Sequence, residues 1–283
     1  MEFQFLGPLT MRSGNSSFHI SGERGRKLLA RLVIDVNRDV TIDRLIDTVW
    51  DADPPATARQ QIQNRLGRLR ALLSQNASGQ QIVRHGNCYQ LQSAEEHVDG
   101  LRFRRLCAEA EIAHRSGDAA HATALFRQGL TLWRGNALQD IHSDALQADA
   151  IHWEESRLRA IESLVALEFA RGAGVSIISE LQSWVAKYPY HEGLHCRLSE
   201  ALHEAGRTVE SLAAIRGLRH RLDLELGIAP GAAVNELERR ILVSQEALPP
   251  ASIHLDREAA EALRRALSET TRALAILATV LAC

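Results

Sequence analysis

The alternation of apolar and polar residues divides the first hundred residues into short strands and helices. A two-residue period indicates strands, whereas apolar residues three and four positions apart indicate helices. On this basis we expect strands, helices and a closing β-hairpin over residues 2–6, 18–20, 23–36, 41–50, 56–74, 81–84 and 88–91. Thr41 is the expected N-cap of the second helix, and Pro54–Pro55 prevents its continuation. Strands, three helices and a hairpin, in this order, predict a winged helix-turn-helix.

The third helix differs in chemistry between its two sides. Ile62, Leu66, Leu69 and Leu73 fall on one narrow arc, which predicts the core face. The other side carries arginine and amide side chains, which can pair with guanine and adenine in the major groove. The hairpin that follows can touch the DNA backbone or the minor groove. The candidate DNA-binding residues are Arg59, Gln60, Gln63, Asn64, Arg65, Arg68, Arg84 and His85. The alternative is a polar, solvent-exposed helix face.

From Val98 onward the pattern is helical and contains an internal repeat. Gly117, Gly172 and Gly206 are each followed by apolar residues at helical spacing. Gly172 and Gly206 are 34 residues apart, which is the tetratricopeptide period, whereas an insertion separates Gly117 from Gly172. A helix pair of this kind cannot bury its apolar face alone, so stacking supplies the core. Such stacks usually bind partners, and a plain helical bundle is the alternative.

These patterns predict a mainly α protein in three parts. The parts are a winged-helix DNA-binding domain with small β-sheets and a wing hairpin over 1–95, an all-α tetratricopeptide-like domain over 98–248, and a helical tail over 251–283. In the tail, apolar and small residues alternate three and four apart, as in a heptad seam. The tail could be a dimer helix, pack on the last repeat, or begin a longer chain, and the sequence leaves these alternatives open.

Charge refines this picture because it is uneven along the chain. The 283 residues contain 33 Lys and Arg against 35 Asp and Glu, a formal net charge of −2. Residues 35–53 include six aspartates and two arginines, whereas 56–89 include five arginines and no acidic residue. This asymmetry suggests two surfaces for two different partners, or equally a solvated helix whose charge is balanced elsewhere. With no run of 18 apolar residues and no signal-peptide pattern, we expect a cytoplasmic protein with no membrane partner.

One motif resembles a catalytic site. His191 and His195 flank a glutamate in an H-E-x-x-H pattern, in which both histidines can bind zinc and the glutamate can act as base. The extended zinc-protease form fails because Leu198 and Ala201 occupy the later positions. The segment 22–27 lacks the glycine and hydroxyl positions of a phosphate loop, and the four cysteines form no C-x-x-C pair. We therefore expect no enzyme, no metal ion and no cofactor, with a zinc hydrolase as a rival hypothesis.

Several stretches of the chain are similar to those of one known family. They are Phe5-Leu6-Gly7-Pro8-Leu9, Asp43-Arg44-Leu45-Ile46-Asp47 with Trp50, Pro54-Pro55, Leu66-Gly67-Arg68-Leu69-Arg70, Asp99 with Arg102-Phe103, Leu132-Trp133-Arg134-Gly135, Ala205-Gly206-Arg207, and Glu225-Leu226-Gly227 with Pro230. Spanning about residues 1–245, they resemble the Streptomyces antibiotic regulatory protein family. Its members join an OmpR-like winged helix to a tetratricopeptide-like bacterial transcriptional activation domain.

The resemblance implies a pathway-specific activator of secondary-metabolite genes. Two protomers would bind direct repeats in double-stranded promoter DNA, through the eight residues named above, and recruit RNA polymerase with its sigma factor. The loop from Trp50 to Pro55 matches the family's transactivation loop, so Trp50, Asp51 and Asp53 would contact the polymerase. Arg65 stands where an aromatic residue is common, which implies a different base preference, and His203-Glu204 replaces a usual aromatic–basic pair. The rival from another class is a helical-repeat scaffold that binds only protein.

Overall fold

The structure, a computed structural model, describes residues 1–14, 16–18, 20–75 and 79–246. Contacts divide the chain into two compact units, Met1–Tyr188 and a second unit that begins at Pro189. Both are mainly helical, and small antiparallel sheets occur in the first, which confirms the predicted fold class. The predicted tail over 251–283 lies outside the described residues.

The first unit begins with the predicted winged helix. Its elements are β1 (Glu2–Gln4), β2 (Thr10–Ser13), β3 (Ser16–Phe18), α1 (Glu23–Ile34), β4 (Val40–Thr41), α2 (Ile42–Trp50), α3 (Ala58–Gln75), β5 (Gln81–His85) and β6 (Cys88–Gln92). They form two antiparallel sheets, ordered β1-β2-β3 and β4-β6-β5. The expected strand over 18–20 was misplaced, because β3 ends at Phe18. Alternation in the sequence also missed β2, which is polar at three of its four positions.

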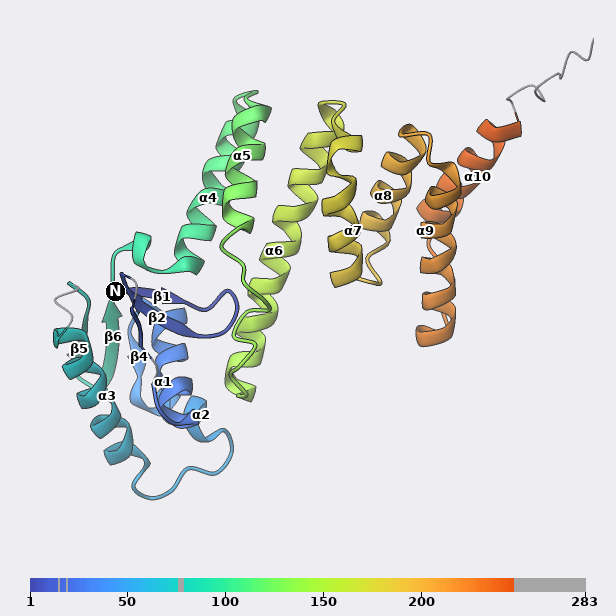
Figure 1. The fold of residues 1–283 in the computed structure, drawn as a ribbon. Coiled ribbons are helices and arrows are strands. Elements are labelled where there is room, and N and C mark those ends of the chain that lie inside the picture. Colours follow the sequence, from blue (N-terminus) through green and yellow to red (C-terminus); the bar gives the residue numbers. More distant parts are fainter. Residues whose placement is uncertain (15, 19, 76–78, 247–283) are drawn as a thin grey trace, which may run out of the picture. The chain divides into compact units, whose positions relative to one another are not determined.

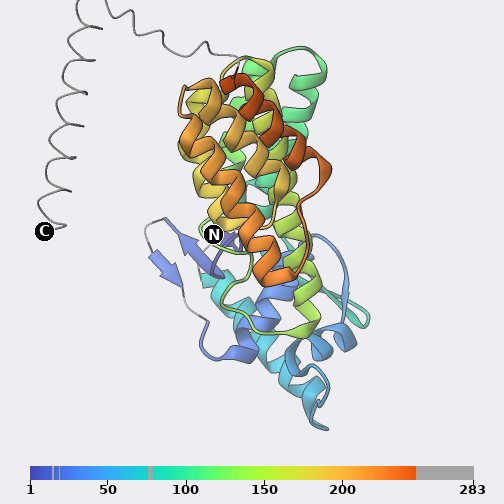
Figure 2. The same ribbon diagram turned by 90° about the vertical axis from the view of Figure 1, so that its right-hand side faces the viewer.

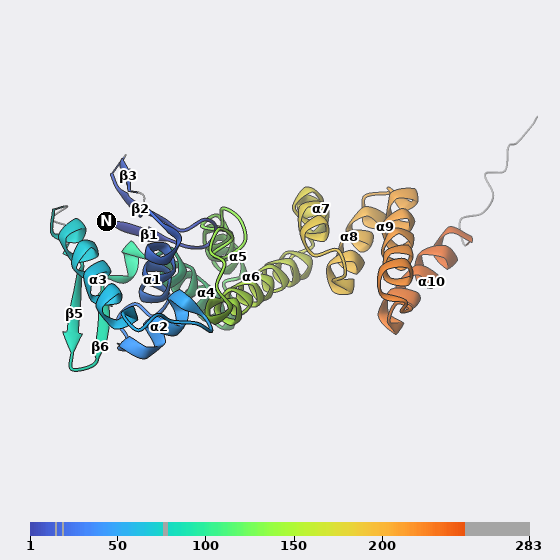
Figure 3. The same cartoon turned by 90° about the horizontal axis from the view of Figure 1, so that it is seen from below.

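The local sequence explains where α2 begins and which side of α3 is buried. The Thr41 hydroxyl accepts a hydrogen bond from the Arg44 amide at 3.2 Å, which confirms the predicted N-cap of α2. Ile62, Leu66, Leu69 and Leu73 on α3 are all buried, as predicted. This apolar arc fixes the rotation of α3 about its axis, so its polar side faces outward. Figures 1 and 3 show α3 at the edge of the winged helix, beside the hairpin β5–β6.

The rest of the first unit is helical. It comprises η1 (Glu95–His97), α4 (Asp99–Arg115), α5 (Ala119–Leu130), α6 (Asp144–Ala170), η2 (Gly174–Ile177) and α7 (Ile178–Lys187). Gly117 and Gly172 have φ angles of 85° and 70°, a left-handed conformation that favours glycine, and each lies between paired helices as the repeat predicts. The start of α6 lies beside α2 (Figure 1).

Asp99 at the start of α4 joins the winged helix to these helices. Its buried carboxylate accepts hydrogen bonds from the amides of Phe5 and Leu6 at 2.9 to 3.0 Å, and from that of Gly100 at 2.8 Å. Burial raises the pKa of Asp99 to about 6, although these hydrogen bonds oppose the shift. Phe5 also packs edge-on against Trp153 of α6, with ring centroids 5.0 Å apart. This shared core explains why the first compact unit extends well beyond residue 95.

The second unit holds the next helix pair of the chain. It contains α8 (Glu192–Glu204), α9 (Thr208–Arg221), a π-helical turn η3 (Leu222–Leu226) and α10 (Ala232–Glu246). Gly206, with φ of 76°, connects α8 to α9 as the repeat predicts. A core is formed by Ile215, Leu218, Leu222, Val234, Leu237 and Ile241. Figures 1 and 2 show α8, α9 and α10 side by side.

Candidate nucleic-acid interface

The outward side of α3 presents the predicted side chains. Arg59, Gln60, Asn64 and Arg68 are exposed, whereas Gln63 and Arg65 are half-buried on the flanks. The amide of Gln60 donates a hydrogen bond to the Asn64 carbonyl oxygen at 3.3 Å, one helical turn away. This pairing holds two amide side chains on the surface that would face a base edge.

The first turn of α3 is connected to the hairpin. The Arg59 guanidinium donates to the side-chain oxygen of Asn87, in the turn between β5 and β6, at 2.9 Å. It also lies 3.4 Å from the Asp43 carboxylate on α2. Arg59 therefore contacts both α2 and the turn of the hairpin from its position on α3.

The middle of α3 carries positive charge without a carboxylate partner. Among the described residues, neither Arg65 nor Arg68 forms an ion pair, and the buried Nε of Arg65 has no hydrogen-bond partner. Burial, and then the charges of Arg24 and Arg68, lower the pKa of the Arg65 guanidinium. The positive charges of Arg24 and Arg68 act on Arg65, so this part of the surface attracts an anion such as a phosphate.

Arg24 is the member of this group that the sequence analysis missed. It lies on α1, about 40 residues before Arg65, and its guanidinium is 5.5 Å from the centre of the Trp50 ring. A cavity of about 150 Å³ beside Arg65 and Arg68 is also lined by Ser21, just before α1, and by Gly25 in its first turn. Helical spacing within one segment cannot find such a neighbour, because Arg24 and Arg65 lie on different helices.

The wing places its two predicted residues at the surface. Arg84 and His85 are both exposed at the end of β5. The Arg84 Nε donates to the Gly86 carbonyl at 2.9 Å, and His85 Nδ1 lies 2.9 Å from an Asp39 carboxylate oxygen. Arg70 of α3 donates to the Ile82 carbonyl at 2.8 Å and so fastens the hairpin to α3.

The loop after α2 gives its three candidate residues different surroundings. The carboxylate of Asp51 lies 3.1 Å from Lys27 Nζ, and accepts hydrogen bonds from the Ser143 hydroxyl at 3.2 Å and the Asp144 amide at 3.1 Å. Although burial opposes the shift, the Lys27 contact lowers the pKa of Asp51. Trp50 is half-buried beneath Arg24, whereas Asp53 is exposed.

The acidic stretch before this loop is largely paired within the chain. Asp35 pairs with Arg31 at 2.8 Å, Asp39 with His85, and Asp43 with Arg59. Among the described residues, Asp47 and Asp53 are the aspartates of this stretch without an ion pair. Several of the negative charges in this acidic stretch therefore contact basic side chains of the winged helix, and Asp51 also contacts the start of α6.

The H-E-x-x-H residues have structural contacts in the second unit. His191 is the N-cap of α8, and its Nδ1 accepts a hydrogen bond from the Leu194 amide at 3.2 Å. The Glu192 carboxylate accepts from the Gly231 amide at 3.0 Å. His195 is buried, and burial and then the charge of Arg221 lower its pKa. Within the described ranges, no group of three or more potential ligands could hold a metal ion.

Known proteins are similar to this chain along most of its length. The model of the bacterial transcriptional activator domain matches residues 98–242. The transcriptional regulator RedD of Streptomyces coelicolor is 34% identical over 253 residues, covering 88% of this chain and 72% of that protein. The regulatory protein DnrI of Streptomyces peucetius is 31% identical, covering 86% of this chain and 92% of that protein.

A solved structure supports the same relationship. Mycobacterium tuberculosis EmbR, in complex with a low-affinity phosphopeptide, matches with a TM-score of 0.76 and 28% identity, covering 96% of this chain and 70% of that chain. A winged helix followed by a bacterial transcriptional activator domain defines a bacterial transcriptional activator, which confirms that the protein is not an enzyme. The chain belongs to the Streptomyces antibiotic regulatory protein family. None of the helices in the described part of the chain is long and apolar enough to cross a membrane.

Proposed function

We propose that this activator binds promoter DNA in a sequence-specific manner and controls a secondary-metabolite gene cluster. The observation that carries the proposal is the outward side of α3. There the amide pair Gln60–Asn64 adjoins two arginines that have no carboxylate partner in the described part of the chain. Amides and guanidinium groups are the side chains that read adenine and guanine in the major groove. The family also implies direct repeats as the target and two protomers on DNA.

The contacts divide between base reading and phosphate binding. Gln60, Asn64 and Arg68 are exposed on the central part of α3 and would read base edges. Arg24 of α1 and Arg65 of α3 would hold a backbone phosphate. Gln63 would lie at the flank of the same surface. Arg84 and His85 on the wing would contact the adjacent backbone or minor groove, with Arg59 in contact with the turn of the hairpin.

Activation would follow from recruitment of RNA polymerase holoenzyme to the occupied promoter. The loop from Trp50 to Pro55 is the proposed contact for the sigma factor or another polymerase subunit. Asp53 is its strongest candidate because it is exposed and has no ion pair among the described residues. Asp51 would act mainly by holding the loop against α6, and Trp50 by supporting it from beneath. Such an activator acts in the cytoplasm, where bacterial DNA is transcribed.

Selection of binding sites from a random double-stranded DNA pool tests the proposal directly. We expect purified protein to enrich two like-oriented half-sites about one helical turn apart. We also expect affinity to fall steeply with salt, since phosphate contacts release counterions. Enrichment of a single site would retain DNA reading but contradict paired binding. No enrichment at low salt, by protein shown to be folded, would favour the rival scaffold that binds only protein.

A further inference from the structure

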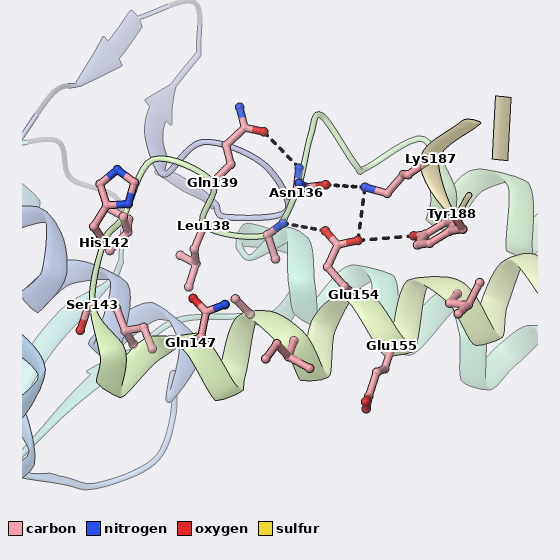
Figure 4. A pocket seen from close by; sticks show the side chains of 16 residues that line it. Asn136, Leu138, Gln139, His142, Ser143, Gln147, Glu154, Glu155, Lys187 and Tyr188 are labelled. Carbon is pink, nitrogen blue, oxygen red and sulfur yellow. Dashed lines mark hydrogen bonds and ion pairs between the residues drawn. The ribbon is translucent and has the colours of Figure 1, made fainter. Parts of the chain in front are cut away.

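A cavity of about 530 Å³ lies in the first unit, away from the proposed DNA surface. Its walls are the N-terminal half of α6, the segment 136–143 that precedes α6, and the end of α7 with Tyr188 (Figure 4). Cavities of several hundred cubic ångströms are typical of small-molecule sites, which combine apolar walls with a few polar groups. This cavity has a polar part and an apolar part, which lie at different places along its lining.

The polar part is built by Asn136, Glu154, Lys187 and Tyr188 (Figure 4). One oxygen of Glu154 accepts a hydrogen bond from the Ala137 amide at 2.9 Å. The other lies 3.3 Å from Lys187 Nζ and 3.4 Å from the Tyr188 hydroxyl. Lys187 also donates to the Asn136 side-chain oxygen at 2.6 Å. These contacts hold the ammonium group of Lys187 at the cavity wall, so the cationic end of the site exists before any ligand arrives.

Charges of both signs lie around this end, and the exposed Glu155 of α6 lines the cavity as well. Arg157 lies 3.9 Å from the same Glu154 oxygen, so two cations share one carboxylate. Burial, and then the charge of Arg157, lower the pKa of Lys187. The ammonium group has three N–H donors, and the described residues supply two acceptors, Asn136 and Glu154. A carboxylate from a ligand would accept the third hydrogen bond.

The apolar part lies along α6 and the facing segment. Leu138 and Leu146 are buried and form its floor, while Ala150 and Leu158 are half-buried. Ile151, which also lines the cavity, is 51% exposed. An apolar ligand that covered these side chains would remove this surface from water, which is favourable in proportion to the area covered.

We propose that this cavity binds a small amphipathic carboxylic acid, with its carboxylate at Lys187 and its apolar body over Ala150 and Ile151. The cavity is also connected to the winged helix, because segment 136–143 lines the cavity and contacts the winged helix. Gln139, Ile141 and His142 line the cavity, while Asp140, between Gln139 and Ile141, accepts a hydrogen bond from the Leu9 amide at 2.9 Å and pairs with Arg26 of α1. A ligand therefore changes the DNA affinity, a consequence that rests on the proposed DNA-binding function.

Titration of the full chain with decanoate, below its micelle concentration, tests the site. Decanoate has the required carboxylate and apolar chain, and decylamine, with the opposite charge, is the matched probe. We expect decanoate to bind more tightly than decylamine. Ala150→Phe, which fills the cavity, should weaken decanoate binding about tenfold or more. Ala148→Phe, on the exposed side of α6 and outside the cavity, is the control and should bind like the unaltered protein.

The cationic end is tested separately. Lys187→Met should weaken decanoate about fivefold or more, since it removes a charge-assisted hydrogen bond, whereas Arg115→Met at an exposed position on α4 should not. Circular dichroism and thermal unfolding establish that each variant is folded. Absent binding, equal binding of both probes, or equal binding by Ala150→Phe and Ala148→Phe would overturn the site.

The route to DNA is tested with the selected operator. Saturating decanoate should change the operator affinity of the unaltered protein about threefold or more, and leave that of Ala150→Phe unchanged. Decanoate binding with no change in operator affinity would overturn the regulatory consequence while the site stands. Loss of operator binding without decanoate would instead count against the proposed function.

Discussion

Helices α1 and α3 are both rich in arginine, but their positive charges have opposite surroundings. On α1, Arg31 is only 1% exposed and lies 2.8 Å from both Asp35 and Asp149. Lys27 lies 3.1 Å from Asp51, and Arg26 pairs with Asp140. On α3, Arg65 and Arg68 have no carboxylate partner among the described residues.

This difference shows that a basic helix identifies a partner surface only when the opposite charge is absent nearby. Charges that are removed from water need a partner within the chain, since the desolvation cost is otherwise large. Two of the acidic partners of α1, Asp140 and Asp149, come from the segment before α6 and from α6 itself, more than 100 residues away in sequence. Charges at a solvent-exposed face can instead stay without a partner until an anion binds.

The largest expected effect, on stability, comes from removing an ion-paired arginine of α1. Arg31→Met leaves Asp35 and Asp149 without their shared cation, and should lower the free energy of unfolding by about 3 kcal/mol. This is the lower end of the range for a broken buried ion pair, because Asp149 keeps some contact with water. Denaturant titration followed by circular dichroism measures the change. Arg38→Met, at an exposed position just after α1, should unfold at the same denaturant concentration as the unaltered protein, and a similar midpoint for Arg31→Met would contradict the prediction.

The second effect, on DNA affinity, comes from removing an arginine of α3 that has no carboxylate partner among the described residues. Arg68→Ala should weaken specific DNA binding by about 1–3 kcal/mol if its guanidinium makes a bidentate base contact, with little change in stability. Arg26→Ala, on the paired side, should instead cost stability and leave the sequence preference unchanged, because Arg26 is held by Asp140. Fluorescence anisotropy with the selected operator measures both. Unchanged affinity and sequence preference would remove Arg68 from the base-reading residues.

A smaller effect separates two aspartates of the same loop. Asp51→Ala removes the acceptor for Ser143 and the Asp144 amide and the partner of Lys27, and should lower stability by about 1–2 kcal/mol. Because the folded-state pKa of Asp51 lies below its ordinary value of 3.8, this contribution is present above that pH and is lost as the pH falls through the lowered pKa. Denaturant titrations of both proteins at several pH values measure it.

Asp53→Ala should behave in the opposite way. Asp53 is exposed and without an ion pair among the described residues, so stability should change by less than about 0.5 kcal/mol. Transcription from the target promoter in a reconstituted assay should fall while DNA affinity stays the same. Equal loss of both by Asp53→Ala would argue against a separate activation surface.

The sequence predicted local features well because they depend on neighbours along the chain. The buried arc of α3, the Thr41 cap and the glycines at 117, 172 and 206 all follow from spacing and backbone preference. It did not predict contacts between distant segments. Arg24 and Arg65 lie on different helices, and Asp51 is bound by residues at the start of α6. The role of each charge was therefore less predictable than the fold that carries it.

The smallest expected effect comes from adding a methyl group at Gly67, on the exposed side of α3. Gly67 lies between Asn64 and Arg68 on the exposed side, and a Cβ atom there would meet nothing within 4 Å. Alanine is a better helix former, so Gly67→Ala should raise the free energy of unfolding by about 0.5–1 kcal/mol. DNA affinity should nevertheless fall, because the added methyl group stands where the groove edge approaches the helix most closely.

Gly217 on α9 provides the matched control. It is also a helical glycine with open space around its Cβ position, but it lies in the second unit. Gly217→Ala should give a similar gain in helix stability and leave operator affinity unchanged. If both substitutions stabilise the protein and neither weakens DNA binding, then the surface at Gly67 is not the point of closest approach, and the base-reading residues lie nearer the first turn of α3, at Arg59, Gln60 and Gln63.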